Sequence, residues 1–243
     1  MSASEQPART VADEPAVRRR STRDRPAKAP LSEDAVIDAA LEILKTEGLE
    51  AVTMRHVAKA LDTGAASLYV YVSGREGLLQ GMLDRVASLV ELEQPDPERW
   101  RDQLRSLMRR MHAAFTAHPG IAAITLGDPP NTDAILAVAE NLLGILLAGG
   151  LSVQDAAWAC DLCTLLVTAV ATEDDAWRAE GRSDDDRRRE VDEMERLFAG
   201  LPPERFPLLA AHAIPMVTGD GDDRFNFALD VIIDGLLARN ARA

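Results

Sequence analysis

Residues 53–75, TMRHVAKALDTGAASLYVYVSGR, constrain the fold more than any other stretch of the chain. Val57-Ala58 and Leu61 are spaced as one apolar side of a short helix. Thr53 precedes them, where a threonine hydroxyl accepts a hydrogen bond from a free amide of the first turn. The run Asp62–Gly64 is too polar and too rich in Asp and Gly to continue the helix. The stretch therefore predicts a short helix, a tight turn and a second helix.

The second of these helices is expected to run from Ala65 to about Val72, with Leu68 as its inward anchor. Small side chains let a helix approach base edges in a DNA major groove, and phenols can reach phosphates. The sequence therefore predicts a DNA-reading helix. Its outward residues are Ala65, Ala66, Ser67, Tyr69, Val70 and Tyr71.

This stretch resembles the helix-turn-helix domain of the TetR family of bacterial transcriptional regulators. The matching residues are Thr53, Val57-Ala58, Ser67-Leu68-Tyr69 and Ser73-Gly74-Arg75-Glu76-Gly77-Leu78-Leu79. The resemblance is strong from Leu31 to about Leu89. Beyond it, only a helical pattern and a few residues of the chain's end match.

Three positions depart from the family pattern. Asp62 stands where glycine is usual, Gly64 where a capping serine is frequent, and Val72 where phenylalanine is common. Aspartate tolerates left-handed backbone, so we expect the turn to be preserved. Glycine weakens a helix cap only slightly.

Together, the residue pattern and the resemblance predict the DNA contacts. They are Thr53, Arg55, Gly64, Ala65, Ala66, Ser67, Tyr69, Tyr71 and Arg75, the last on a phosphate. A basic cluster, Arg18, Arg19 and Arg20, precedes the first helix. Two interpretations stay open for it: a solubilising tail, or an arm that places an arginine in the minor groove.

Charge is distributed unevenly along the chain. The net charge is −13, which argues against nonspecific binding of nucleic acid. Residues 1–30 nevertheless carry seven basic and four acidic side chains, and residues 53–75 carry three and one. Residues 93–243 carry 15 basic and 26 acidic side chains. The acid is thus concentrated away from the proposed DNA face, and a local basic footprint remains possible.

An all-α fold follows from the composition and periodicity. Hydrophobic residues make up 47% of the chain and aromatics 4%, so the core is built mainly from Ala, Leu, Val and Ile. We expect a basic arm over residues 1–30, a helix-turn-helix domain over 31–92 and a helical ligand-binding and dimerisation domain over 93–243. The first expected helix is Ser32–Glu47. The helices expected after the helix-turn-helix are Ser73–Leu92, Pro97–Ala117, Ile121–Leu126, Thr132–Ala148, a helix capped by Ser152 and ending near Ala176, Arg205–Met216 as helix or loop, and Arg224–Ala241. The charge run 180–195 is interpreted as a solvated loop and an exposed helix face.

No catalytic constellation stands out in the sequence. The four histidines lack metal-ligand spacing, and Cys160 and Cys163 alone are a weak zinc or redox signal, better explained as core thiols. We therefore expect no enzyme activity, no metal and no cofactor. Two cysteines and no leader segment indicate a cytoplasmic protein, and the apolar segments are interrupted by polar residues, which indicates no membrane partner.

The resemblance implies two functions for the second domain. A mostly apolar effector pocket is expected from Trp100, Met108, Met111, His112, Phe115, Trp158 and Cys163, although each of these alone is more simply a core residue. A homodimer interface is expected from the helices Val153–Ala176 and Arg224–Ala241. The residues expected to form it are Ala156, Ala159, Phe225, Leu229, Ile233 and Leu236.

These features predict a homodimeric repressor that binds a palindromic operator in double-stranded DNA and is released by a small, largely apolar effector. Two alternatives stay open. One is a DNA-binding regulator or activator that has no small-molecule ligand. The other is a helical enzyme with an incidental helix-turn-helix, against which the missing acid, base or nucleophile cluster argues.

Overall fold

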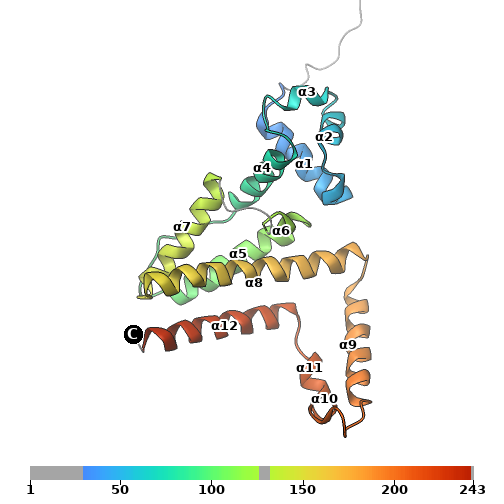
Figure 1. Ribbon diagram of the computed structural model, residues 1–243, viewed down its shortest axis with the longest axis vertical. Helices are drawn as coiled ribbons and strands as arrows, with labels where there is room; N and C mark the ends of the chain where they lie inside the picture. The colour runs from blue at the N-terminus through green and yellow to red at the C-terminus, as the bar shows by residue number, and fades with distance from the viewer. Residues whose placement is uncertain (1–29, 126–131, 242–243) are drawn as a thin grey trace, which may run out of the picture. The chain divides into compact units, whose positions relative to one another are not determined.

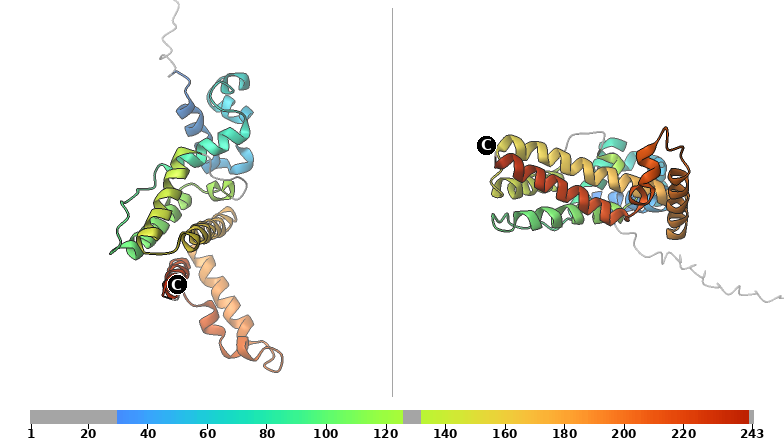
Figure 2. Two further views of the ribbon diagram at one scale, coloured as in Figure 1. Left: turned by 60° about the vertical axis from the view of Figure 1, so that its left-hand side comes forward. Right: turned by 90° about the horizontal axis from the view of Figure 1, so that it is seen from below.

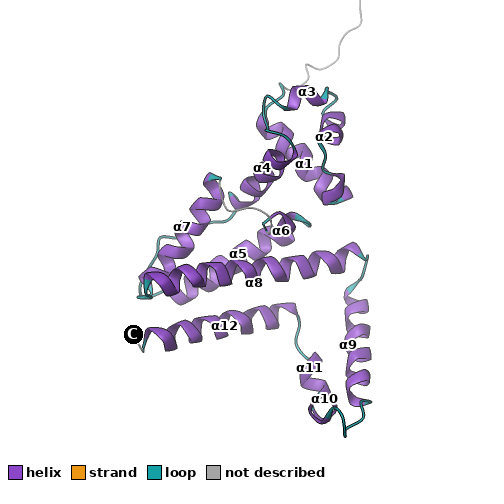
Figure 3. Cartoon of the chain, in the orientation of Figure 1, coloured by secondary structure: helices purple, strands orange, loops and turns teal. Residues whose placement is uncertain are grey.

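The computed structural model describes residues 30–125 and 132–241, and every regular element in those ranges is helical (Figure 3). All of these helices belong to one compact unit, Ser32–Ala243. This confirms the all-α prediction. The elements are α1 Glu33–Glu47, the 3₁₀ turn η1 Leu49–Ala51, α2 Met54–Ala60, α3 Ala65–Leu68, α4 Arg75–Ala87, α5 Trp100–Thr116, α6 Ile121–Ile124, α7 Asp133–Ala148, α8 Val153–Ala179, α9 Asp184–Ala199, α10 Pro207–Ala211, α11 Ala213–Val217 and α12 Gly221–Asn240 (Figure 1).

The first helices begin where their capping residues predict. The Ser32 hydroxyl accepts from the Ala35 amide at 3.2 Å, and the Thr53 hydroxyl accepts from the His56 amide at 3.2 Å. Each cap satisfies an amide that has no partner inside its own helix. α1 packs against α4 and α2, and its apolar side is buried at Val36, Ile37, Ala40, Ile43 and Leu44.

Two elements are shorter than the sequence predicted. α3 ends at Leu68 and does not reach Val72, because the chain tightens into turns in which the Tyr71 amide donates to the Leu68 carbonyl at 2.9 Å. α4 begins at Arg75, after Gly74 with φ +110°, and ends at Ala87. At its end, the Ser88 hydroxyl donates to the Arg85 carbonyl at 2.7 Å.

α8 is the central helix of the C-terminal part. It packs against α5, α6, α7 and α12 (Figures 1 and 2). Small residues on its inner side, such as Ala156, Ala159 and Ala171, are buried and let these neighbours approach closely. Ser152 caps it, as predicted, by accepting from the Asp155 amide at 3.1 Å.

By length and composition alone, α8 could cross a membrane, since the mean hydropathy of its most apolar stretch is 1.3. A core helix of a soluble protein passes the same test. The buried side of α8 packs against α5 and α12.

The charge run 180–195 forms a short loop up to Ser183 and then an exposed helix, α9, as the sequence predicted. Ser183 and Asp186 form a capping box at the start of α9, in which each side chain accepts from the other residue's backbone amide. α9 contacts α10 and α11, and these two short helices lead back to the start of α12 (Figure 1). The predicted segment Arg205–Met216 is thus two short helices, α10 and α11.

Candidate DNA interface and effector cavity

The segment that begins with α3 presents the outward residues that the sequence predicted. Leu68 is fully buried and anchors the segment, whereas Tyr69 is 60% exposed and Val70 is 81% exposed. Ala66 and Ser67 are also exposed, and Ala65 and Tyr71 are half-buried. The surface is therefore small and apolar along α3 and ends in two adjacent, protruding side chains, a shape that suits entry into a major groove.

The turn before α3 forms although the sequence departs from the family pattern at Asp62 and Gly64. Asp62 adopts φ +50°, the left-handed conformation that aspartate tolerates better than most residues. Gly64 occupies the N-cap position of α3 and supplies no side-chain hydrogen bond. Of the predicted contacts beside it, Arg55 is exposed, while the Thr53 hydroxyl serves as the cap of α2.

Arg75 makes internal contacts that the sequence did not reveal. Its Nε donates to the Val52 carbonyl at 3.1 Å, and its Nη2 donates to the Leu49 carbonyl at 3.4 Å. The guanidinium therefore holds the η1 turn against the start of α4. Because Arg75 remains exposed and has five N–H donors, its other donors are still available for a phosphate. Arg18, Arg19 and Arg20 lie outside the described residues.

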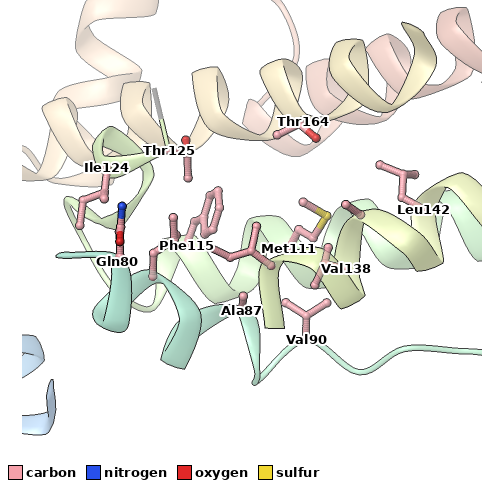
Figure 4. Close-up of a pocket in the computed structure, with 13 residues that line it drawn as sticks. Gln80, Ala87, Val90, Met111, Phe115, Ile124, Thr125, Val138, Leu142 and Thr164 are labelled. Carbon is pink, nitrogen blue, oxygen red and sulfur yellow. The ribbon is translucent and has the colours of Figure 1, made fainter. Parts of the chain in front are cut away.

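A cavity opens between α4, α5, α7 and α8 (Figure 4). It holds about 920 Å³ of empty space, counting the part open to solvent. Apolar side chains dominate its walls, and its polar groups are Gln80, Thr125 and Thr164. The remaining lining residues are Leu83, Ala87, Val90, Met111, Phe115, Ile124, Ile135, Val138, Ala139 and Leu142.

The polar groups of the cavity are uncharged. No charged side chain is among the described residues that line it. The Thr125 hydroxyl donates to the Ala122 carbonyl at 2.7 Å and lies 3.1 Å from the Thr168 hydroxyl. In Figure 4, Gln80 and Ile124 lie toward one end of the cavity and Leu142 toward the other. The site suits a ligand that is mainly apolar and has few polar groups.

Two of the predicted pocket residues, Met111 and Phe115, line this cavity, and five do not. Met108 is buried in the core. The ring of Trp100 packs over Gly149, where an added Cβ would lie 2.5 Å from the indole Cδ2. Trp158 is 63% exposed on α8.

His112 and Cys163 also lie away from the cavity lining. The His112 Nε2 is 3.3 Å from the Asp174 Oδ2, and its ring stacks on Phe225 with centroids 5.1 Å apart. Cys163 is fully buried, and burial raises the pKa of its thiol to about 12. A thiol with such a pKa is a core group and a poor nucleophile.

The sequence interpretation missed the contributions of α4 and α7 to the cavity. Gln80, Leu83 and Ala87 come from α4, and Ile135 and Val138 come from α7. Helical spacing marks the apolar residues among them as inward-facing, and this is the only signal that the sequence offers. Inward spacing does not tell whether a side chain meets a neighbour or an empty space.

All six residues predicted for the dimer interface are buried within the subunit. Their side chains are 8% exposed or less, because α12 packs its stripe against α8 inside the chain. They are therefore not available to a partner in this arrangement. The apolar residues that α8 and α12 leave exposed are different: Trp158, Leu162, Leu165, Phe227 and Val231.

No group of three or more His, Cys, Asp or Glu side chains that could hold a metal ion occurs in the described ranges 30–125 and 132–241. The fold and the two sites thus define a class: a helical protein with a helix-turn-helix near one end and an apolar cavity that the following helices enclose.

Comparisons with known proteins place the chain within that class. Residues 36–82 match the family described as bacterial regulatory proteins, tetR family, and residues 94–240 match the tetracyclin repressor-like C-terminal domain. The chain therefore belongs to the TetR family of bacterial transcriptional regulators. This family is non-enzymatic, so the enzyme alternative is excluded.

Individual relatives share most of the chain. The HTH-type transcriptional repressor DrrR1 of Streptomyces coeruleorubidus is 31% identical over 221 residues, which cover 87% of this chain and 80% of that protein. The crystal structure of apo ActR from Streptomyces coelicolor is 36% identical with a TM-score of 0.80, and the match covers 89% of this chain and 99% of ActR. ActR in complex with actinorhodin is 36% identical, also with a TM-score of 0.80, over 86% of this chain and 97% of that one.

Proposed function

We propose that this regulator is a cytoplasmic repressor that binds a palindromic operator as a homodimer and is released by an uncharged, mainly apolar small molecule. Residues 31–92 then form the DNA-binding domain and residues 93–243 the effector and dimerisation domain. The apolar cavity joined directly to α4 carries this proposal, because α4 follows the helix-turn-helix and also forms one wall of the cavity.

The DNA part of the proposal rests on the exposed segment after the turn. Ala66 and Ser67 leave room for base edges, and Tyr69 and Val70 protrude beside them. DrrR1 is named a repressor, which favours repression over activation here. A reporter driven by the bound promoter should therefore rise when the gene for this protein is deleted.

Operator binding can be tested on the DNA that flanks the protein's own gene. Wild-type protein should shift this DNA specifically, and Ala66→Asp should abolish the shift because a carboxylate on this face is repelled by the negative charge of the DNA. Ala113→Asp, at an exposed position of α5, adds the same charge away from the face and should bind normally. Equal binding by Ala66→Asp and wild type would contradict the assignment of this face.

The effector part rests on the uncharged walls of the cavity. The ActR structures include a complex with actinorhodin, so a related protein is known to take a small molecule. No hydrogen bond is found for the Gln80 carboxamide within the described ranges, so this group is free to bind a ligand. Burying a charge without a partner is costly, so an anionic ligand should bind poorly at this wall.

Two fluorescent probes test this selectivity. N-phenyl-1-naphthylamine is uncharged, and 8-anilinonaphthalene-1-sulfonate carries the same ring systems with a sulfonate. The uncharged probe should bind more tightly, and Ala139→Trp, at the rim of the cavity, should weaken its binding. Ala137→Trp is exposed on the same helix outside the lining and serves as the control. Preference for the sulfonate would contradict an uncharged effector.

The dimer part rests on the apolar face that α8 and α12 leave exposed. Trp158, Leu162 and Leu165 recur along α8, and Phe227 and Val231 lie one turn apart on α12. Such a contiguous face on helices that pack together is typical of a protein interface. Two copies would place two recognition helices about 34–36 Å apart, one turn of DNA.

Sedimentation at micromolar concentration tests the dimer. Wild type should sediment as a dimer, and Phe227→Arg should give monomers because it buries an unpaired charge in the interface. Ala113→Arg, at an exposed position of α5, adds the same charge away from this face and should remain a dimer. A monomeric wild-type protein would rule out this part of the proposal.

A further inference from the structure

Two neighbouring charged residues of α4 bind to two different helices. The Asp84 Oδ1 accepts a hydrogen bond from the Ala134 amide, in the first turn of α7, at 2.8 Å. The next residue, Arg85, donates from Nη1 to the Asp38 Oδ1 of α1 at 2.7 Å and also bonds to Asp34. α4 is thus tied to the wall of the cavity on one side and to the first helix of the DNA-binding domain on the other.

The contact with α7 replaces a local cap. The first amides of a helix have no partner within the helix, and the N-cap side chain usually supplies one. At the start of α7 the N-cap is Thr132, whose side chain makes no capping bond and whose hydroxyl is buried without a partner in the described structure. Asp84, 50 residues earlier in the chain, supplies the acceptor, and its carboxylate also suits the positive end of the helix dipole.

This bond lies at the edge of the effector cavity. Asp84 follows Leu83 and is one turn from Gln80, and both line the cavity from α4. Ala134 precedes Ile135 and is one turn from Val138, and both line it from α7. The bond therefore joins the two helices whose facing sides the ligand would occupy, and these helices also pack directly on each other.

We propose that Asp84 is a positioning residue that couples the effector cavity to the DNA-binding domain, through its cap on α7 and the adjacent Arg85 contact with α1. The inference rests on the proposed function and identifies the contact through which ligand binding would regulate DNA binding. We assign the cap to the DNA-binding arrangement because it holds α4, and with it the Arg85 contact with α1, in place against α7. A ligand that separates α4 from α7 stretches the 2.8 Å bond beyond hydrogen-bonding distance and frees α4 to carry α1 with it.

The coupling has a definite sign. If the cap stabilises only the ligand-free arrangement, its removal favours the ligand-bound arrangement by the full strength of the cap. Capping substitutions change an equilibrium by about five- to thirtyfold. Ligand affinity should rise by up to that factor, whereas operator affinity should fall only when the second arrangement becomes well populated.

The experiment uses the full chain, operator DNA and N-phenyl-1-naphthylamine as the probe. Asp84→Ala should bind the probe about five- to thirtyfold more tightly than wild type and release operator at a correspondingly lower probe concentration. Asp84→Asn retains an acceptor oxygen without the charge and should fall between the two. A cap with only a structural role would leave probe affinity unchanged or reduce it, since a looser cavity binds less well.

Asp133→Asn is the matched control. Asp133 is exposed in the same first turn of α7 and also favours the helix dipole, but it is on α7 itself and does not join two helices. Its loss should leave probe affinity within about twofold of wild type, because a dipole contribution at the surface is small. An equal rise in probe affinity for Asp133→Asn and Asp84→Ala would assign the effect to the start of α7 itself and would contradict a coupling role for Asp84.

The outcomes separate the inference from the proposed function. Wild type that binds the probe and operator, with an unchanged probe affinity in Asp84→Ala, overturns the inference alone. Wild type that binds no operator overturns the DNA part of the proposed function, and the probe comparison still tests the cap. Wild type that binds operator but no probe overturns the effector cavity and the inference together.

Discussion

Arg75 gives the sharpest test of how this DNA-binding domain is held together. The sequence assigns it to a DNA phosphate, whereas the structure also places its guanidinium on the carbonyls of Val52 and Leu49. We predict that Arg75→Ala lowers the stability of the folded protein as well as its affinity for operator. A residue that only contacted DNA would affect affinity alone.

The expected loss follows from the two bonds. A hydrogen bond from a charged donor contributes about 1.5–3 kcal/mol, and exposure to solvent places this one at or below the lower end of that range. The Nη2 bond, at 3.4 Å, is too long to add much. We therefore expect a loss of about 1–2 kcal/mol, or roughly 2–8 °C in melting temperature for a chain of this size.

Thermal unfolding followed by circular dichroism measures this loss, and a mobility shift on the same preparations measures operator binding. Arg55→Ala is the control, since Arg55 is exposed on α2 and has no hydrogen bond or salt bridge to any described residue. It should melt within about 1 °C of wild type, as is usual for surface changes. If Arg75→Ala melts like Arg55→Ala but loses operator binding, the internal contacts contribute nothing and the reasoning fails.

Three further substitutions test the packing and the electrostatics. Gly149→Ala should cost about 1–3 kcal/mol in urea denaturation, because its Cβ would lie 2.5 Å from the indole Cδ2 of Trp100. Gly74→Ala should cost about 1–3 kcal/mol in the same assay, because φ is +110° there, a conformation that residues with a side chain rarely adopt. Burial raises the pKa of Asp175, whose carboxylate accepts from the Gly120 amide at 2.7 Å, so the folded state disfavours its ionised form. Asp175→Asn keeps the acceptor and cannot ionise; it should be more stable than wild type at neutral pH, and this advantage should disappear as the pH falls below the raised pKa of the carboxyl.

The sequence predicted the starts of the three helices with Ser or Thr caps because capping is a local event. Ser32, Thr53 and Ser152 each accept from an amide three residues later, and a reader of the sequence needs only that short window. The ends were predicted less well. α3 was expected to reach Val72, but its last residues form turns that lead into Gly74, and the preference for turns there depends on how the segment packs.

The cavity could be predicted only in part for a physical reason. Met111 and Phe115 were expected because they lie on the inward stripe of α5, and they do line it. Met108 lies on the same stripe and is packed in the core. Periodicity identifies the side of a helix that faces inward, but the volume left between several helices depends on all of their side chains at once.

The choice of residues for the interface met a similar ambiguity. α12 is apolar on two sides, and the stronger stripe, which includes Phe225 and Leu229, was assigned to a partner subunit. The structure uses that stripe inside the chain and leaves Phe227 and Val231 exposed. A sequence shows that an apolar side of a helix must be buried, but it does not show whether the packing partner belongs to the same chain or to another subunit.

Asp84 shows where local reasoning has its limit. In the sequence it is an acid between Leu83 and Arg85 in an amphipathic helix, which predicts nothing more than an exposed position. A cap is sought within three residues of a helix start, and Thr132 fits that rule at α7. The acceptor instead comes from another helix, so the Ala134 amide at the start of α7 has this partner only while α4 stays in place. A cap of this kind links the local stability of one helix to the position of another, and this property is what makes it suited to couple a ligand to DNA.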